Sequence, residues 1–272
     1  MNYKLGIYIK TFSRDFLRVQ RLVESIRRFN VDNIPLYISC PTEEMNTLQK
    51  LLGTKSINFL FDDDIYVPKN PMGGWEQQML IKMYACKTLP CDNTLLIDSD
   101  AQFIREFKQS DFIAYDNVPY TIIHENKQVS EYEKVLKGQD YLDNGYSKAV
   151  RAYRSIFGGK SNKIYDFGPN PHLWSKKVFE DLDTKYLKPN ELDLETFSMA
   201  VKQSYGIHFR ETLTYGEYLL AAQPIPIVPC GPFFKTYHWK EMVDFEKGTG
   251  LEVVDNIKSS YLGLIMQSNF SE

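Results

Sequence analysis

Residues 1–104 alternate short apolar runs with longer helix-like segments, and this alternation limits the possible folds more than any other feature. We expect strands at 4–10, 34–40, 57–61 and 93–97. Between them lie three segments that we predict to be helical, 13–29, 42–52 and 75–89. Strands that alternate with helices are typical of a largely parallel sheet with helices on its faces. The sequence therefore predicts an α/β fold with a mostly parallel central sheet.

Two of these strands end in acidic residues. Asp62, Asp63 and Asp64 follow the third strand, and Asp98-Ser99-Asp100 follows the fourth. Ligands of open α/β sheets bind outside the carboxyl ends of the strands. Carboxylates at that edge suit Mg²⁺ or Mn²⁺, which usually complete their shells with substrate phosphates. The alternative is a solvated polar turn. The Gly-rich phosphate fingerprint is missing after the first strand, which argues against a nicotinamide enzyme.

Composition narrows the functional classes further. The 272 residues are 43% hydrophobic and carry a net charge of −3, so no bulk electrostatic attraction to nucleic acid is expected. We find no signal peptide or spanning segment, so we expect a cytoplasmic protein, with peripheral association at the inner face of a membrane left open. The four cysteines lack metal-site spacing and are expected to be free thiols.

After residue 104 the pattern is looser. We expect a strand at 119–126, a helical region at 130–157, a loop entering a helix at 165–182, helices at 191–206 and 207–222, and an edge strand at 224–230. The apolar stretch 261–270 would pack on its own domain, on a second copy of the chain or on a membrane. No linker or repeat is visible, so a single domain over 1–272 is the simplest organisation.

The ordered segments "GGWEQQMLIKMYA", "LLIDSDAQFI", "HLWSKKVFEDL", "TYGEYLLAA" and "TYHW" resemble the GT-A glycosyltransferase superfamily with its D-x-D motif. They resemble most a bacterial GT-A-like family with functions in polysaccharide synthesis. The resemblance implies a GT-A-like fold, with residues 1–104 binding a nucleoside-diphosphate sugar and 105–272 binding a glycan or lipid-linked acceptor. It also implies an Mn²⁺ or Mg²⁺ cofactor. Asp100 would bind the metal, Asp98 the donor ribose or the metal, and His238 would add a late metal ligand.

The donor would lie against the ends of the first and third strands and the start of the third helix. The candidate residues are Lys10, Thr11, Arg14, Asp62, Asp63, Gln78, Lys82 and Asp98. A helix N-terminus suits phosphate, and Lys82 would neutralise diphosphate charge. The alternative places Trp75 in the core and leaves Gln78 and Lys82 on a solvated helix face.

Sugar transfer with inversion, which we favour, needs a general base for the acceptor hydroxyl. Candidates are Glu217, Asp166 and Glu211, and we place Glu217 first and Asp166 second. A surface carboxylate is the alternative for Glu217. The segment 147–177 is rich in lysine and arginine, which indicates either a solvated face or a patch for an anionic acceptor.

Three other functions stay open at this point. A D-x-D phosphatase would use the first aspartate as nucleophile, although such enzymes begin the chain with the motif. A nucleotidyltransferase shares the general architecture but usually has a Gly-rich first loop. A glycan-binding protein without catalytic activity is the third.

Overall fold

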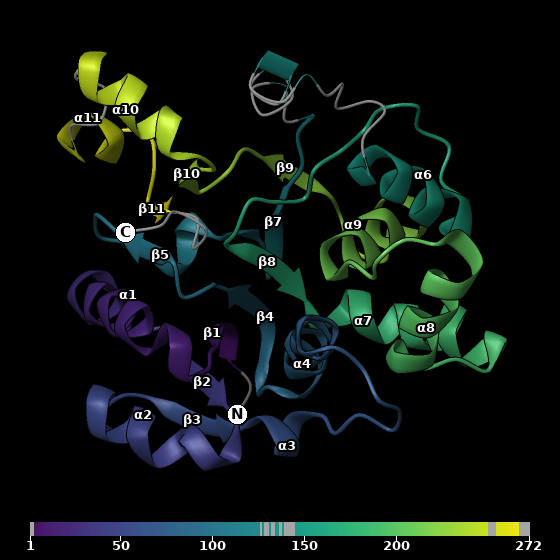
Figure 1. The fold of residues 1–272 in the computed structure, drawn as a ribbon, viewed down its shortest axis with the longest axis horizontal. Coiled ribbons are helices and arrows are strands. Elements are labelled where there is room, and N and C mark those ends of the chain that lie inside the picture. Colours follow the sequence, from purple (N-terminus) through teal and green to yellow (C-terminus); the bar gives the residue numbers. More distant parts are fainter. Residues whose placement is uncertain are drawn as a thin grey trace.

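The computed structural model describes residues 3–125, 145–249 and 254–266, with positions 127, 131, 134, 135 and 138. A five-stranded sheet in the order β3-β2-β1-β4-β8 lies at its centre (Figure 1). The first four strands in the chain are mutually parallel, and β8 is antiparallel to β4. The predicted α/β class with a mostly parallel sheet is confirmed. The strands are β1 (Tyr3–Lys10), β2 (Leu36–Cys40), β3 (Asn58–Phe61), β4 (Cys91–Leu96) and β8 (His172–Ser175).

Helices cover both faces of this sheet. Ile7 and Ile9 of β1 share an apolar cluster with α1 and α2. Tyr8, on the opposite face of the same strand, belongs to the cluster that contains α4. Because alternate residues of a strand point to opposite faces, β1 is buried on both sides and its run is apolar throughout. The helices of this half are α1 (Phe16–Phe29), α2 (Met45–Leu52), the single turn α3 (Asp62–Ile65) and α4 (Gly74–Thr88).

The later part of the chain adds two three-stranded sheets beside the central one, in the orders β10-β11-β5 and β6-β7-β9. β5 follows directly from the Asp98–Asp100 turn, and it pairs with β11 in antiparallel register. The D-x-D turn therefore connects the central sheet to the β10-β11-β5 sheet. The strands are β5 (Ala101–Phe103), β6 (Ile113–Tyr115), β7 (Val118–Ile122), β9 (Val228–Cys230), β10 (Phe234–Tyr237) and β11 (Gly263–Met266).

Four helices of the later part, α6 to α9, pack with α4 around one apolar cluster at the β8 side of the sheet (Figure 1). No helix in the described part of the chain is both long and apolar enough to cross a membrane. The helices are α6 (Gly145–Phe157), α7 (Lys176–Leu182), α8 (Leu194–Tyr205), α9 (Glu211–Ala222), α10 (Lys240–Thr249) and α11 (Val254–Lys258).

One prediction of secondary structure is wrong. The segment 165–182 was expected to be a loop that enters a helix, but His172–Ser175 forms β8 and pairs with β4. A run of four residues shows no period by which a strand could be recognised, and β8 exists because β4 offers it an open edge.

Two other segments of the later half form strands that pair within the chain. The edge strand is confirmed over Val228–Cys230, and Gly263–Met266 of the C-terminal stretch packs on its own chain as β11. The acidic run after β3 folds as the helical turn α3. Of the helical region expected over 130–157, most of residues 130–144 lies outside the described residues.

Candidate functional site

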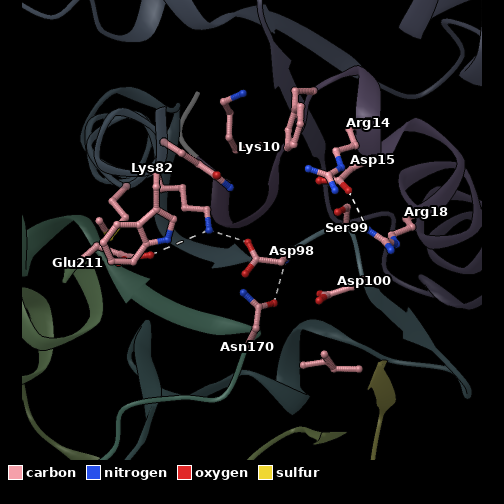
Figure 2. Close-up of a pocket in the computed structure, with 15 residues that line it drawn as sticks. Lys10, Arg14, Asp15, Arg18, Lys82, Asp98, Ser99, Asp100, Asn170 and Glu211 are labelled. Carbon is pink, nitrogen blue, oxygen red and sulfur yellow. Dashed lines mark hydrogen bonds and ion pairs between the residues drawn. The ribbon is translucent and has the colours of Figure 1, made fainter. Parts of the chain in front are cut away.

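A polar cavity of about 640 Å³ opens where the parallel strands β1 and β4 end side by side (Figure 2). Its lining comes from strand ends, the N-terminal part of α4, the start of α9 and a loop before β8. This is the sheet edge at which the sequence predicts a ligand. The lining residues are Lys10, Phe12, Arg14, Asp15, Arg18, Trp75, Gln78, Met79, Lys82, Asp98, Ser99, Asp100, Asn170, Glu211 and Ile265.

The backbone of the D-x-D turn is held by two segments distant in sequence. The amide of Asp98 donates to Oδ1 of Asn170 at 2.9 Å. The amide of Met266, at the end of β11, donates to the carbonyl oxygen of Asp100 at 3.2 Å. Both carboxylates lie in the cavity (Figure 2). Their positions are therefore fixed by the fold rather than by the turn alone.

Lys82 of α4 forms the central ion pair of the cavity. Its ammonium lies 2.6 Å from Oδ1 of Asp98 and 4.0 Å from Oε1 of Glu211, and its side chain is 6% exposed. Burial raises the pKa of Asp98, but the charge and hydrogen bond of Lys82 outweigh burial and hold it below its usual value. Burial lowers the pKa of Lys82, and Asp98 and Glu211 outweigh burial in the opposite direction. Asp98 and Lys82 are therefore both charged at neutral pH.

A second buried ion pair lies at the end of β1. The Lys10 ammonium is 2.8 Å from Oδ2 of Asp62, and it donates to the carbonyl oxygen of Thr11 at 2.7 Å. Within the described residues, Oδ1 of Asp62 and the hydroxyl of Thr11 are buried and have no hydrogen-bond partner. Buried polar atoms are nearly always satisfied by protein, water or ligand. These two atoms therefore mark a place where a bound molecule could complete the bonding.

Two exposed aromatic side chains border this region. Trp75 is 51% exposed and Phe12 is 37% exposed. Both line the main cavity and a neighbouring cavity of about 410 Å³, to which Asp62 also contributes. The alternative that places Trp75 in the core is therefore wrong, because α4 turns its first residues towards the open sheet edge. The ring of Trp75 meets only His208 edge-on, at 5.8 Å between centroids, among the ring contacts of the described residues.

The structure brings most of the predicted donor residues together. Lys10, Arg14, Gln78, Lys82 and Asp98 line the main cavity with Asp100. Asp62 lines the neighbouring cavity instead, and Thr11 lies 1% exposed behind Lys10.

Asp63 lies apart from these residues. It accepts a hydrogen bond from the Thr42 hydroxyl at 3.0 Å and lines neither of these cavities. We therefore leave Asp63 out of the site proposed below.

The residue placed first as general base lies in the interior. Glu217 is 1% exposed and accepts two hydrogen bonds from the Arg154 guanidinium, at 3.0 and 2.7 Å. It is not among the residues that line the main cavity. Such a bidentate pair ties α9 to α6 and satisfies the carboxylate. Glu211, at the first residue of α9, faces the cavity instead, and it is the candidate base that the geometry favours.

Asp166 and His238 also lie outside the main cavity. Asp166 shapes the turn before β8, where its Oδ1 accepts from the amide of Gly168 at 2.9 Å. His238 lines a separate cavity with His124. The structure thus does not bring either residue to the lining that contains Asp98 and Asp100.

Sequence reasoning missed Asn170, Arg18 and the exposure of Trp75. Asn170 carries the one useful signal, since it stands between two prolines directly before an apolar stretch. It could have been assigned only after β8 was recognised as a neighbour of β4. Arg18, which pairs with Asp15 at 3.0 Å, occupies the first turn of α1 and follows no motif.

The carboxylate oxygens at the D-x-D turn suit a hard divalent cation. No group of three or more histidine, cysteine or acidic side chains arranged for a metal occurs among the described residues. Mg²⁺ and Mn²⁺ are commonly held by one or two carboxylates, with substrate phosphates and water as the other ligands. Asp98 and Asp100 in an open polar cavity fit that pattern.

Comparison with known proteins identifies the family. Residues 4–252 match the model of a family of unknown function, DUF6492, and the chain belongs to that family. No curated protein matches the sequence. A crystal structure of mouse xyloside xylosyltransferase 1, apo form, is similar to this chain at 9% identity and a TM-score of 0.48, with 100% of both chains covered. A likeness of this degree supports no conclusion about activity, which is argued below from the site itself.

Proposed function

We propose that this protein is a metal-dependent glycosyltransferase that uses a nucleoside-diphosphate sugar. The observation that carries the proposal is the cluster of Asp98, Asp100 and Lys82 in an open polar cavity at the carboxyl ends of β1 and β4. This edge is where α/β sheets bind nucleotides. The resemblance of the sequence to GT-A enzymes points to the same chemistry.

The charge of the cavity supports a requirement for a divalent cation. Among the residues that the structure describes, the lining holds four cationic side chains, Lys10, Arg14, Arg18 and Lys82, and four acidic ones, Asp15, Asp98, Asp100 and Glu211. A diphosphate entering a balanced site would add uncompensated negative charge. Mn²⁺ or Mg²⁺ held by Asp98 and Asp100 would supply the missing positive charge and act as a Lewis acid on the diphosphate.

The protein's own residues would act on the leaving diphosphate and on the acceptor hydroxyl. Lys82 is fixed and largely desolvated, so its ammonium can stabilise the negative charge that develops on the leaving diphosphate. Glu211 lies on the other side of Lys82 from Asp98, at 4.0 Å from its ammonium. We assign Glu211 as the base that accepts the proton of the acceptor hydroxyl. Inversion of the anomeric centre is part of this proposal.

The donor's nucleoside would occupy the side of the site formed by Lys10, Phe12 and Trp75. The neighbouring cavity of about 410 Å³ combines aromatic surface with the unpartnered oxygen of Asp62. An aromatic face can stack on a base, and a carboxylate can accept from a ribose hydroxyl or a base N–H. The product would belong to a bacterial surface polysaccharide, as the sequence resemblance implies.

The direct test is incubation of the purified protein with a panel of nucleotide sugars and Mn²⁺, with and without EDTA. We expect release of the nucleoside diphosphate from one donor, and loss of that release with EDTA. Release of inorganic phosphate would indicate the phosphatase instead. Formation of a nucleotide sugar from a sugar phosphate and a nucleoside triphosphate would indicate the nucleotidyltransferase, and no turnover with any donor would favour a binding protein.

Replacing Lys82 with methionine should slow turnover by about 10²- to 10³-fold, because a fixed donor to the developing charge is removed. KM for the donor should change much less than kcat. The measurement is steady-state kinetics of diphosphate release. Lys87→Met is the matched control, since Lys87 is on the same helix and pairs with Asp183 away from the cavity. Equal effects of the two substitutions would contradict the function assigned to Lys82.

Replacing Trp75 with alanine should weaken donor binding by about 5- to 150-fold, because base stacking on an aromatic ring contributes about 1–3 kcal/mol. The dissociation constant of uridine diphosphate, measured by calorimetry with Mn²⁺, is the observable. Tyr115→Ala removes an equally exposed aromatic ring that lines neither cavity, and it should leave the dissociation constant unchanged. An unchanged constant in Trp75→Ala would remove this residue from the nucleoside site.

A further inference from the structure

A second large cavity, of about 580 Å³, lies beside β10 and the start of α10. It shares no lining residue with the main cavity among those that the structure describes. Its size falls within the range of small-ligand sites. The lining residues are His124, Glu125, Lys127, Pro169, Pro232, Phe234, Lys235, Thr236, His238, Met242, Glu246 and Tyr261.

The two cavities are separated by a thin boundary with two parts. In the loop before β8, Pro169 lines the second cavity and the next residue, Asn170, lines the main one. In the β10-β11 pair, Thr236 lines the second cavity and its direct partner in register, Ile265, lines the main one. Ligands in the two cavities would therefore lie close enough for their ends to meet near the D-x-D turn.

Cationic groups outnumber acidic ones around the second cavity. Glu246 is held by Lys235 at 2.6 Å and by the Tyr237 hydroxyl at 2.8 Å. Glu125 pairs with Lys163 at 3.0 Å. Lys127 is the second lysine of the lining, beside Lys235. Lys163 lies outside the lining but neutralises Glu125, so among the described residues three lysines accompany the two lining glutamates, and a ligand with one negative group is favoured.

The polar atoms of the cavity also suit hydroxyl groups. Nε2 of His124 lies 2.5 Å from the carbonyl oxygen of Gly168 and donates to it, so Nδ1 is the ring nitrogen that could contact a ligand. The Thr236 hydroxyl is buried and has no hydrogen-bond partner in the described part of the chain. Tyr261, which is partly exposed, supplies apolar surface. Hydroxyl partners next to apolar faces are what a sugar ring requires.

We propose that this second cavity binds the acceptor, and that the acceptor is a saccharide bearing a carboxylate or phosphate group. The assignment rests on the proposed glycosyl transfer. It adds a location and a chemical class to the acceptor: the sugar ring lies against Tyr261, and its anionic group meets Lys127 and Lys235. The reactive hydroxyl points across the boundary formed by Asn170 and Ile265 towards the donor.

The four histidines of the chain make a direct binding test possible. His124 and His238 line the second cavity, whereas His208 contacts Trp75 beside the main cavity and His172 lies buried near Asp98. Their imidazole NMR signals, assigned by single His→Asn variants, are followed at constant pH. The probes are glucuronic acid, glucose 6-phosphate, glucose and, separately, uridine diphosphate with Mn²⁺.

We expect one or both anionic sugars to shift the signals of His124 and His238 and to leave His208 in place. A response to glucuronic acid indicates a carboxylate ligand, and a response to glucose 6-phosphate indicates a phosphate ligand. Glucose should bind at least about fivefold more weakly. Shifts of His208 alone, equal binding of glucose, or no shift with either anionic sugar up to millimolar concentrations would overturn the proposal. Uridine diphosphate should shift His208, and its failure to do so would count against the donor site instead.

A charge reversal provides an independent check. Lys127→Glu should weaken binding of the responsive anionic sugar by about fivefold at low salt, because the substitution removes an attraction and adds a repulsion. Lys50→Glu makes the same charge change on the exposed face of α2, at a residue that lines neither cavity, and should have no effect. Equal weakening by both variants would show a bulk charge effect and contradict a local site.

Discussion

Replacing Asp100 with asparagine should lower kcat for diphosphate release by about 10²- to 10³-fold, and it should weaken Mn²⁺ binding in the same protein. Asparagine keeps the shape of the side chain but removes the charge that a hard divalent cation requires. The resemblance to D-x-D enzymes assigns the metal to Asp100, so the substitution is made at this residue. The measurement pairs turnover with a titration of Mn²⁺ followed by electron paramagnetic resonance.

The control for this experiment is Asp116→Asn. Asp116 lies at an exposed turn with φ of 43°, a conformation that asparagine tolerates, and it lines neither the main cavity nor its neighbour. The control should keep both turnover and Mn²⁺ affinity. If Asp100→Asn behaved like Asp116→Asn, the turn after β4 would have no part in metal binding.

The second large effect should be on stability. Arg154→Met should lower the free energy of unfolding by about 3–5 kcal/mol, because it leaves the carboxylate of Glu217 buried without its cation. Glu217 is 1% exposed and its two hydrogen bonds to Arg154 would both be lost. Burial also raises the pKa of Glu217, against the opposing effect of Arg154. Urea unfolding followed by circular dichroism gives the free energy.

Two further variants test this prediction, one as a compensating substitution and one as a surface control. The double variant Arg154→Met with Glu217→Leu should recover most of the lost stability, since an apolar pair can replace a buried ion pair. It should also keep diphosphate release within about tenfold of the unmodified protein if Glu217 has a structural function. Lys148→Met, on the exposed face of α6, should change stability by no more than about 0.5 kcal/mol. Loss of turnover in a stable double variant would restore Glu217 as a candidate base.

The residues predicted best are those placed by strand direction. Lys10 and Asp98 end neighbouring parallel strands, and parallel strands bring their carboxyl ends to one edge. Gln78 and Lys82 follow because α4 begins at that same edge. Such predictions require only the order of strands and helices along the chain. That order is indicated by the hydrophobic pattern and by the turn residues between the segments.

The residues predicted least well depend on which side of an element meets which neighbour. Glu211 and Glu217 lie on one helix, six residues apart, yet one faces the cavity and the other faces α6. No spacing in the sequence shows that Arg154 lies opposite Glu217. Likewise, the place of His238 follows from the pairing of β10 with β11, two segments separated by α10 and α11.

The most direct test of the central claim is a crystal structure with uridine diphosphate and Mn²⁺, with the metal located by anomalous scattering. We predict an anomalous peak bonded to Asp100, a diphosphate reaching the Lys82 ammonium, and a nucleoside beside Trp75 and Asp62. Nucleotide and metal bound elsewhere, with no density beside these residues, would contradict the account.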